Sequence, residues 1–301
     1  MVTPAYLKQG DTIGIVAPAR KITYSQIEYS INIFESWGLT VKTGKNLFGD
    51  FHQFSGTDKQ RCDDFNEMIY DDSIKAIICA RGGYGTIRIL DNIDFEYFKN
   101  HPKWISGYSD ITAIHSHVNT CLNIETVHST MPIDFSDKPD NIISQNSLKN
   151  VLFGENIEYT CENQELYRAG STTAQIIGGN LSILFALLST KSEIDTNQKI
   201  LFIEDVDEYL YHIDRMMVNL KRAGKLNNLR GLIVGGMTDM KDNEIPYGFN
   251  VTEIIASAIA EYEYPVCFNF TAGHQPLNLA LIMGREIDFT VNKNNTIIKF
   301  K

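Results

Sequence analysis

An alternation of two hydrophobic periods along the first half of the chain constrains the fold more than any other feature. Residues 12–18, TIGIVAP, form a short apolar run that a proline ends. Residues 25–38, SQIEYSINIFESWG, then place Ile27, Ile31 and Phe34 on one face of a helix. The same alternation recurs along the rest of this half. It predicts an α/β fold in which a parallel sheet is covered by helices on both faces.

The periodic pattern weakens in the middle of the chain and then returns. Residues 136–170 begin with a polar, turn-rich stretch, which favours a linker between two folded units. Apolar runs reappear after it, for example KILFIED at 199–205 and GLIVGG at 231–236, with helical segments between them. The sequence therefore predicts a first domain over residues 1–135, a linker over 136–170 and a second domain over 171–301.

The balance of charge argues against several classes of partner. The chain has 301 residues with 27 basic and 37 acidic side chains, which gives a net charge of −10. Because an acidic surface disfavours contact with nucleic acids and with anionic membranes, we expect neither partner. The longest apolar stretch, around LSILFALLS, is too short to span a bilayer. The N-terminus has no basic leader before a long apolar run, so we expect a cytoplasmic protein.

The sequence offers no motif for a metal or a cofactor. Its five cysteines are widely spaced and match neither a disulfide framework nor a CxxC metal site. The segment ARGGYG at residues 80–85 has neither the GxGxxG spacing of dinucleotide-binding proteins nor the spacing of a P-loop. We therefore expect no metal and no cofactor.

A serine stands at the predicted end of an apolar strand. Ser109 lies in GYSD at residues 107–110, between a strand-like run and a helical segment. Ligands of doubly wound sheets bind beyond the carboxyl ends of the strands, and a serine on a sharp strand-to-helix turn exposes its hydroxyl group there. Ser109 is therefore a candidate nucleophile. In the alternative, Ser109 or Asp110 only caps the following helix, since GYSD lacks the second glycine of the GxSxG motif.

Two adjacent glycines follow another apolar strand. Gly82 and Gly83, in ARGGYG, permit a ligand to approach the backbone closely. Their N–H groups can complete an oxyanion hole next to Ser109. In the alternative, the segment is an ordinary tight turn.

A serine nucleophile needs a base, and His274 is the best placed of the seven histidines. It follows a predicted strand in the segment FNFTAGHQP, between Gly273 and a proline-containing loop. Such a loop can hold an exposed imidazole in a fixed position. His128 is a second candidate for the base, and an ordinary surface histidine is the alternative interpretation of His274.

A carboxylate that can orient the base ends another apolar strand. Glu204 and Asp205 follow the run ILFI. A carboxylate at this place can accept a hydrogen bond from a histidine N–H group and fix the tautomer of the ring. In the alternatives, the acidic residues only begin a helix, or they form a metal site with His274, for which the sequence shows no supporting ligand spacing.

Six segments together resemble the LD-carboxypeptidase family of serine peptidases, which includes muropeptide carboxypeptidases and microcin C self-immunity proteins. The resemblance covers nearly the whole chain, and the six segments occur in the order found in the family. They are LKQGDTIGIVAPA (7–19), IKAIICARGGYG (74–85), GYSDITAIH (107–115), IIGGNLSIL (176–184), LFIEDVDEYLYHIDRMMVNLKRAG (201–224) and AGHQP (272–276).

The resemblance implies a catalytic triad of Ser109, Glu204 and His274. These residues match the serine of the G-[YF]-S-D motif of the family, the glutamate of its apolar-E-D motif and the histidine of its G-H motif. The resemblance also implies an N-terminal flavodoxin-like domain with the nucleophile and a β-rich C-terminal α/β domain with the other two residues. The site would lie between the domains. Family members are usually homodimers, so we expect a homodimer.

Further site residues follow from the same resemblance. The oxyanion donors of the family correspond to the backbone N–H groups of Gly83 and Asp110, and Gly82 is a further candidate in the same loop. Arg81 is placed to meet a substrate carboxylate, although a structural ion pair is an equal alternative. Asn180 is a weaker candidate for a substrate contact.

The implied activity is that of a serine-type LD-carboxypeptidase, a hydrolase that removes terminal D-alanine from small murein tetrapeptides during cell-wall recycling. The alternative within the family is a microcin C immunity-type amidase that acts on peptidyl or aminoacyl nucleotides. Such proteins tend to have a longer, aromatic segment after the first domain, whereas residues 134–170 here are short and lack tryptophan. A non-catalytic ligand-binding module is a third interpretation, since flavodoxin-like sheets also host sensors.

The chain departs from the family pattern after the fifth predicted strand. Residues 127–132 read VHSTMP where relatives often have HGPM, so Ser129 and Thr130 replace a small, rigid pair. The segment GHQPLNLALIMG also lacks the glycine that is common after the proline. These differences concern the wall of the substrate pocket rather than the triad.

Overall fold

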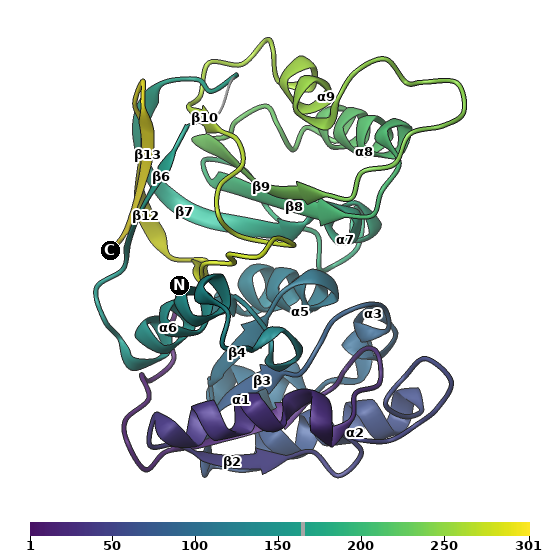
Figure 1. Ribbon diagram of the computed structural model, residues 1–301, viewed down its shortest axis with the longest axis vertical. Helices are drawn as coiled ribbons and strands as arrows, with labels where there is room; N and C mark the ends of the chain where they lie inside the picture. The colour runs from purple at the N-terminus through teal and green to yellow at the C-terminus, as the bar shows by residue number, and fades with distance from the viewer. Residues whose placement is uncertain (164–165) are drawn as a thin grey trace.

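Two β-sheets with accompanying helices make up the computed structural model of the chain (Figure 1). The structure describes residues 1–163 and 166–301. A six-stranded sheet belongs mainly to the first half of the chain, and a seven-stranded sheet belongs to the second half. Strands alternate with helices in the first half and pair in parallel there, which confirms the predicted α/β fold.

The first sheet has the strand order β11-β5-β4-β3-β1-β2. Its strands are β1 (Thr12–Val16), β2 (Thr40–Thr43), β3 (Ile74–Cys79), β4 (Trp104–Gly107), β5 (Thr126–His128) and β11 (Leu281–Met283). Neighbours from β5 to β2 pair in parallel, whereas β11 pairs antiparallel with β5. Without β11 the order is that of flavodoxin-like sheets, in which ligands bind where the strand order reverses, beside β1 and β3.

Helices connect the strands of the first sheet. They are α1 (Tyr24–Ser36), α2 (Asp58–Tyr70), α3 (Thr86–Ile89), α4 (Phe95–Asn100) and α5 (Thr112–His117). The helical face predicted for the first of them packs on the core, since Ile27 and Phe34 of α1 are fully buried and Ile31 is partly buried. Helix α2 begins with a capping box in which the Thr57 side chain accepts a hydrogen bond from the Gln60 N–H group.

The middle of the chain differs from the predicted linker. Residues 136–170 contain helix α6 (Pro139–Phe153) and strand β6 (Glu158–Glu162), and β6 is the edge strand of the second sheet. Residues 164–165 of this segment lie outside the described part of the chain. The segment therefore belongs largely to the folded core of the molecule.

Buried serines on α6 explain why the sequence suggested a linker there. Ser144 Oγ accepts a hydrogen bond from the Asn278 N–H group at 2.9 Å, and Ser147 Oγ accepts one from the Ala280 N–H group at 3.0 Å. The polar face of α6 thus packs against backbone that leads into strand β11. A hydrophobic pattern does not reveal a helix that is held in this way.

The second sheet has the strand order β10-β9-β8-β7-β12-β13-β6. Its remaining strands are β7 (Gly170–Asn180), β8 (Ile200–Val206), β9 (Gly231–Thr238), β10 (Val266–Cys267), β12 (Glu286–Val291) and β13 (Asn295–Phe300), and its helices are α7 (Leu181–Ala186), α8 (Leu210–Arg222) and α9 (Val251–Ala258). The strands from β10 to β7 are parallel, and the pairs from β7 to β6 are antiparallel. None of the helices in the described ranges has the length and apolar composition needed to cross a bilayer.

Helix α5 lies between the two sheets and brings the two halves of the chain together (Figure 1). Thr112, its first residue, accepts a hydrogen bond from the Asn180 N–H group at 3.0 Å. A Cβ atom added to Gly179 would lie 2.5 Å from the Thr112 hydroxyl oxygen, so the end of β7 approaches α5 very closely. This contact places the carboxyl edge of the second sheet next to the turn that follows β4.

Candidate active site

Ser109 stands on a strained turn immediately after strand β4. Its φ angle of 63° lies in the left-handed region, which costs a residue with a β-carbon about 1–3 kcal/mol. Close packing enforces the turn, because a Cβ atom on Gly107 would lie 2.9 Å from Ile111 Cγ1 and 3.1 Å from Cys79 Cβ. The serine therefore occupies a sharp strand-to-helix turn, which is the environment that the sequence suggested.

The glycine-rich loop after β3 lies directly against this serine. A Cβ atom added to Gly82 would lie 3.0 Å from Ser109 Oγ and 3.4 Å from the Asp110 nitrogen. The N–H groups of Gly83 and Asp110 have no hydrogen-bond acceptor among residues 1–163 and 166–301. The structure thus brings the serine and the two expected oxyanion donors to the same place.

The Asp110 side chain ties the serine turn to the loop of glycines. Its Oδ2 atom accepts a hydrogen bond from the Thr86 N–H group at 2.8 Å, and Thr86 is the first residue of α3. Burial raises the pKa of this carboxyl group. Within the described part of the chain, neither Ser109 nor Asp110 caps the helix that follows them. The capping alternative therefore does not describe this turn.

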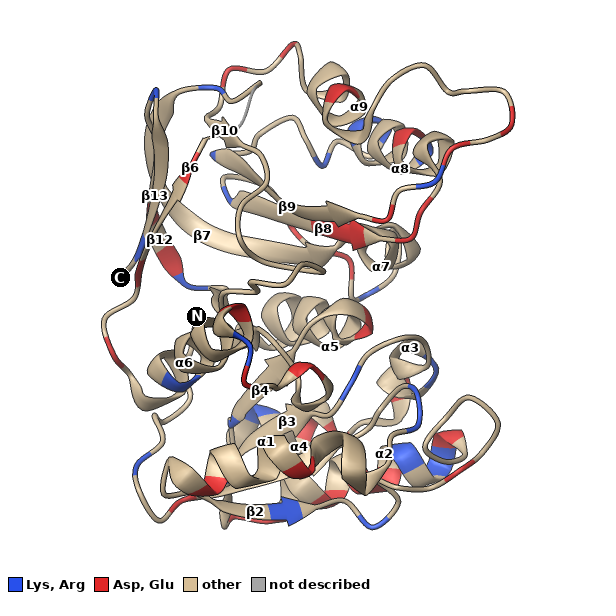
Figure 2. Cartoon of the chain, in the orientation of Figure 1, with Lys and Arg blue, Asp and Glu red and all other residues tan. Residues whose placement is uncertain are grey.

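His274 and Glu204 form the other part of the site. His274 Nδ1 lies 2.6 Å from Glu204 Oε2, and the His274 backbone N–H group donates to the same oxygen at 3.1 Å. Glu204 is fully buried near the end of β8, and Figure 2 shows acidic residues at the end of that strand. Gly273 allows the backbone before His274 to lie close to the Glu204 side chain, because its φ is 99° and a Cβ atom there would lie 2.6 Å from Glu204 Cβ.

Opposing effects act on the pKa of His274. Burial lowers it, whereas the charge of Glu204 and the hydrogen bond to that carboxylate raise it, with smaller contributions from Asp205 and Asp134. The outcome is a pKa above the ordinary value of 6.5. A carboxylate bound at Nδ1 favours the tautomer that leaves Nε2 without a proton, and that nitrogen can then accept one.

One cavity of about 420 Å³ collects the predicted residues from both halves of the chain. Ser109, Gly82, Gly83 and Arg81 line it from the first half, and His274 lines it from the second. Glu204 is not among the described lining residues, since it lies behind His274. The candidate nucleophile and the candidate base therefore line one cavity, and the carboxylate is bonded to the base; no hydrogen bond joins Ser109 to His274 among the described residues.

Four polar side chains of the cavity were not singled out in the sequence: Arg20, Tyr108, Asp134 and Asp207. The ring centroid of Tyr108 lies 4.8 Å from that of His274. Burial raises the pKa of both Tyr108 and Asp134. The rule that selected Ser109, a polar residue after a buried parallel strand, also applies to Arg20 after β1 and would have found it.

Asn180 lies outside this cavity. Its Nδ2 atom donates a hydrogen bond to Asp205 Oδ1 at 2.9 Å, and its Oδ1 accepts one from the Ile183 N–H group at 3.2 Å. Both ends of the amide are thus used to cap α7 and to hold Asp205. Burial and the neighbouring Glu204 raise the pKa of Asp205 to about 6. The Asn180 side chain therefore stabilises the fold, and its position does not support the substrate contact predicted from the sequence.

His128, the second candidate for the base, is placed differently. It is fully buried on β5, with its ring 5.8 Å from that of Tyr108 and 4.9 Å from that of Phe202. Burial lowers its pKa well below the ordinary value. It is not among the described residues that line the cavity. Residues 1–163 and 166–301 also contain no group of three or more His, Cys, Asp or Glu side chains arranged to hold a metal ion.

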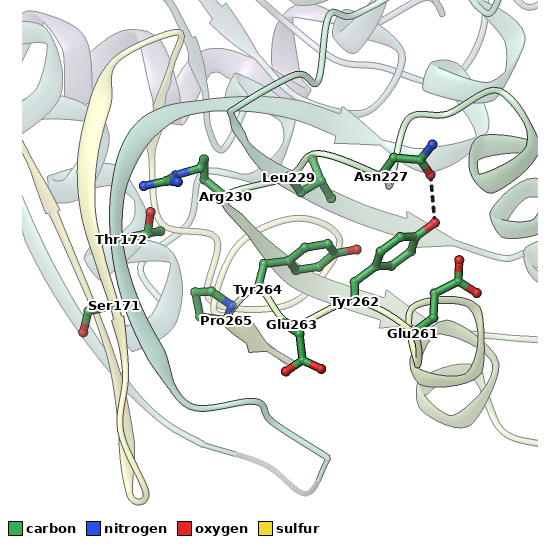
Figure 3. A pocket seen from close by; sticks show the side chains of 10 residues that line it. All are labelled: Ser171, Thr172, Asn227, Leu229, Arg230, Glu261, Tyr262, Glu263, Tyr264 and Pro265. Carbon is green, nitrogen blue, oxygen red and sulfur yellow. Dashed lines mark hydrogen bonds between the residues drawn. The ribbon is translucent and has the colours of Figure 1, made fainter.

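A second cavity, of about 490 Å³, lies near the starts of β7, β9 and β10 (Figure 3). Tyr262 and Tyr264 line it and stack with ring centroids 5.5 Å apart, and Tyr262 donates a hydrogen bond to Asn227 Oδ1 at 2.9 Å. The described residues that line it include no histidine and no cysteine. Although this cavity is the larger of the two, the combination of serine, histidine and free N–H groups identifies the cavity at Ser109 as the candidate active site.

Two parts of the chain match the two domains of a known protein family. Residues 13–129 match the N-terminal domain of LD-carboxypeptidases, and residues 173–289 match their C-terminal domain. Both matches fall inside the domain limits expected from the sequence, residues 1–135 and 171–301, and those limits themselves stay a prediction.

Individual proteins are similar to the chain over nearly its whole length. A probable murein peptide carboxypeptidase of Bacillus subtilis (strain 168) is 33% identical, over 98% of this chain and 94% of that protein. The crystal structure of a muramoyltetrapeptide carboxypeptidase from Oxalobacter formigenes is 21% identical with a TM-score of 0.87, over 96% and 98% of the two chains. The microcin C7 self immunity protein MccF is 22% identical with a TM-score of 0.89, over 100% and 99%.

The two solved structures show that the fold is shared, and they agree with the prediction of two α/β parts. The two domain matches and the relative from Bacillus subtilis show that the amino-acid sequence is also similar to this family. The chain belongs to the LD-carboxypeptidase family of serine-type peptidases.

Proposed function

We propose that the chain is a serine-type carboxypeptidase that cleaves the amide bond between an L-configured centre and a C-terminal D-amino acid, D-alanine, in murein tetrapeptides. The observation that carries the proposal is the 2.6 Å hydrogen bond between His274 and Glu204 at the cavity that also contains Ser109. Relatives named murein peptide carboxypeptidase and murein tetrapeptide carboxypeptidase, the latter from Pseudomonas aeruginosa at 24% identity, support the choice of substrate.

In the proposed reaction, His274 takes the proton of Ser109 as the serine oxygen attacks the carbonyl carbon of the terminal amide. Glu204 holds the imidazole and stabilises the cation that forms. The N–H groups of Gly83 and Asp110 bind the oxygen that becomes negative in the tetrahedral intermediate. His274 then gives the proton to the leaving amine, and water hydrolyses the ester on Ser109 in a second step of the same kind.

The proposal includes a cellular context. We place the reaction in cell-wall recycling in the cytoplasm and expect the protein to act as a homodimer without a cofactor. The family resemblance supports these statements, and the net charge of −10 agrees with a protein that does not bind nucleic acids or anionic membranes. Size-exclusion chromatography with light scattering tests the dimer, which a monomeric mass at micromolar concentration would exclude.

A second candidate function is that of an immunity-type amidase acting on aminoacyl nucleotides. The observation that favours it is the close fold similarity to the microcin C7 self immunity protein, one solved structure of which contains aspartyl sulfamoyl adenosine. The two functions are separated by incubating the protein with a murein tetrapeptide and, in parallel, with aspartyl sulfamoyl adenosine. Mass spectrometry should detect released D-alanine from the first. Cleavage of the nucleotide conjugate alone would replace our proposal with the second function.

A further inference from the structure

Two arginines enter the active-site cavity from the two loops where the strand order of the first sheet reverses. Arg20 follows β1, Arg81 follows β3, and both line the cavity that contains Ser109. In flavodoxin-like sheets the helices after these two strands diverge to opposite faces, which opens a crevice for a ligand. The two guanidinium groups therefore stand where this type of sheet binds small molecules.

Both arginines lack an ion-pair partner within the described part of the chain. Within residues 1–163 and 166–301, neither Arg20 nor Arg81 forms an ion pair with a carboxylate. Arg81 donates one hydrogen bond, from Nη1 to the Lys21 carbonyl oxygen at 3.1 Å, and its buried Nε atom has no acceptor there. The structural ion pair considered for Arg81 in the sequence is not formed in this part of the chain. A buried donor without an acceptor is costly, and a ligand anion would satisfy it.

The two guanidinium groups are close enough to repel each other. Burial lowers the pKa of Arg81, the charge of Arg20 lowers it further, and the charge of Asp134 raises it by a smaller amount. Two carboxyl groups line the same cavity. Asp207 forms an ion pair with Lys241, and Asp134 Oδ2 already accepts a hydrogen bond from the Met131 N–H group at 3.2 Å, while burial raises the pKa of Asp134. An anion bound between the arginines would relieve this repulsion.

The exposed Arg20 side chain also lies against the expected oxyanion site. A Cβ atom added to Gly83 would lie 2.5 Å from Arg20 Cδ and 2.8 Å from Arg20 Nε, so the arginine side chain lies across the Gly83 backbone. Gly83 is one of the two proposed donors to the reacting carbonyl oxygen. In the last residue of a peptide, a single α-carbon separates the scissile amide nitrogen from the free carboxylate. When the scissile carbonyl oxygen occupies the oxyanion site, the free carboxylate of the last residue therefore lies close to that site and within the region that Arg20 enters.

We propose that Arg20 and Arg81 together bind the free α-carboxylate of the departing residue and so restrict hydrolysis to the last bond of a peptide. The inference rests on the proposed function and adds to it the determinant of exopeptidase specificity. Arginine suits this task because its planar group of donors matches the two oxygens of a carboxylate.

A pair of substrates that differ only in this carboxylate tests the inference. One is an N-acylated L-lysyl-D-alanine with a free carboxylate, and the other is the same compound as its C-terminal amide. We expect the wild-type protein to show a kcat/KM about 100-fold higher on the acid, since charge-assisted hydrogen bonds are much stronger than neutral ones. Arg20→Met and Arg81→Met should each lower kcat/KM on the acid by about 10- to 100-fold and leave hydrolysis of the amide nearly unchanged.

Matched variants control for folding and for the total charge. Arg222→Met removes an exposed arginine of α8 that is not among the described residues lining the cavity, and it should leave both rates unchanged. Arg81→Lys keeps the charge but loses the planar fork, so it should recover part of the loss on the acid. Thermal unfolding of each variant shows whether the fold is intact.

The outcomes separate this inference from the proposed function. If the wild-type protein cleaves acid and amide equally well, or if the two methionine variants lose the same factor on both compounds, the carboxylate site is wrong while the peptidase function stands. If neither compound nor a murein tetrapeptide is cleaved by the wild-type protein, the proposed function fails, and the inference fails with it.

Discussion

Glu204 determines both the position and the protonation of His274. One oxygen of this buried carboxylate accepts hydrogen bonds from the ring Nδ1 atom and from the backbone N–H group of His274. Gly273 makes this possible, since any β-carbon there would collide with Glu204. At the scale of single residues, the site therefore depends as much on the glycine as on the two charged groups.

Replacement of the nucleophile should remove activity and leave the fold intact. We expect Ser109→Ala to lower kcat on a murein tetrapeptide by about 10⁴- to 10⁶-fold. The midpoint of thermal unfolding should not fall and can rise, because the serine hydroxyl group has no hydrogen-bond partner among the described residues and its positive φ is unchanged. Residual activity within tenfold of the wild-type value would show that another group attacks the substrate.

The pH dependence of the reaction should report the raised pKa of His274. The imidazole must be neutral to take a proton, so kcat/KM should fall as the pH drops through a value above 6.5. Protonated His274 should also stabilise the folded protein at pH values below 6.5, and this stabilisation should be lost as the pH rises through the folded-state pKa.

Glu204→Gln should move this acid limb toward lower pH. The substitution removes the charge that raises the pKa of His274, while the burial that lowers it remains. We expect kcat to fall by about 10⁴-fold, as when the acid of a serine triad is replaced by its amide. A pH–rate profile measured for both proteins checks the shift. An acid limb at the same pH in both proteins would show that another group titrates.

At the scale of elements, the loop from β3 to α3 contributes Arg81 and Gly83 to the cavity and lies against the candidate nucleophile Ser109. Its glycines bring the backbone against Ser109, and Asp110 holds its far end through the Thr86 N–H group. The turn after β4 and the loop after β3 thus pack against each other as one unit.

Gly82→Ala tests how tightly this unit is built. The new methyl group would lie 2.8 Å from Ser109 Cβ and 3.0 Å from its Oγ, so the loop or the serine must move. We expect kcat/KM to fall by at least about 100-fold, the loss typical for a misplaced oxyanion donor. Gly248→Ala is the control for activity, since nothing lies within 4 Å of its added methyl group; its φ of 93° adds backbone strain, so the variant can lose stability but should keep its kcat/KM. Full activity of the Gly82 variant would mean that the loop is not part of the oxyanion site.

At the scale of the whole molecule, the two halves of the chain exchange structure around the site. Strand β11 comes from the second half but pairs with β5 at the edge of the first sheet. Close to it, the buried Glu125 and the partly exposed Arg285 form an ion pair, with Arg285 Nε 3.1 Å from Glu125 Oε1. Because the proposed triad takes Ser109 from one half and His274 from the other, we expect these contacts to help hold the two residues at the same cavity.

Arg285→Met should therefore weaken the molecule as a whole. The variant leaves the Glu125 carboxylate buried without a partner, a change that costs about 3–5 kcal/mol of unfolding free energy. Urea denaturation should show a lower midpoint, and the additional replacement Glu125→Gln should restore part of it. Lys299→Met, which removes an exposed partner of Glu158, is the matched control and should change the midpoint little. A midpoint unchanged by Arg285→Met would show that the pair is not needed to hold the halves together.

The sequence by itself determined the α/β fold and the candidate site residues in their order along the chain. Apolar strand runs that end in polar residues identified Ser109, Glu204 and His274 separately, because strand periodicity and strand ends are local properties. Motifs shared with a known family then joined them into one hypothesis. The helix at 139–153 was missed since its buried serines bind backbone, and local polarity looks the same whether a side chain meets water or a peptide N–H group.

Only the tertiary structure decided which of these residues share a cavity. It placed Arg20, Tyr108 and Asp134 beside Ser109 and His274, and it engaged the Asn180 side chain with Asp205 and Ile183. It also showed why Gly82 and Gly273 must be glycines, since each lies against a residue distant along the chain. Such pairings depend on strand order and on the packing of two sheets. These are long-range properties that a local pattern of residues does not contain.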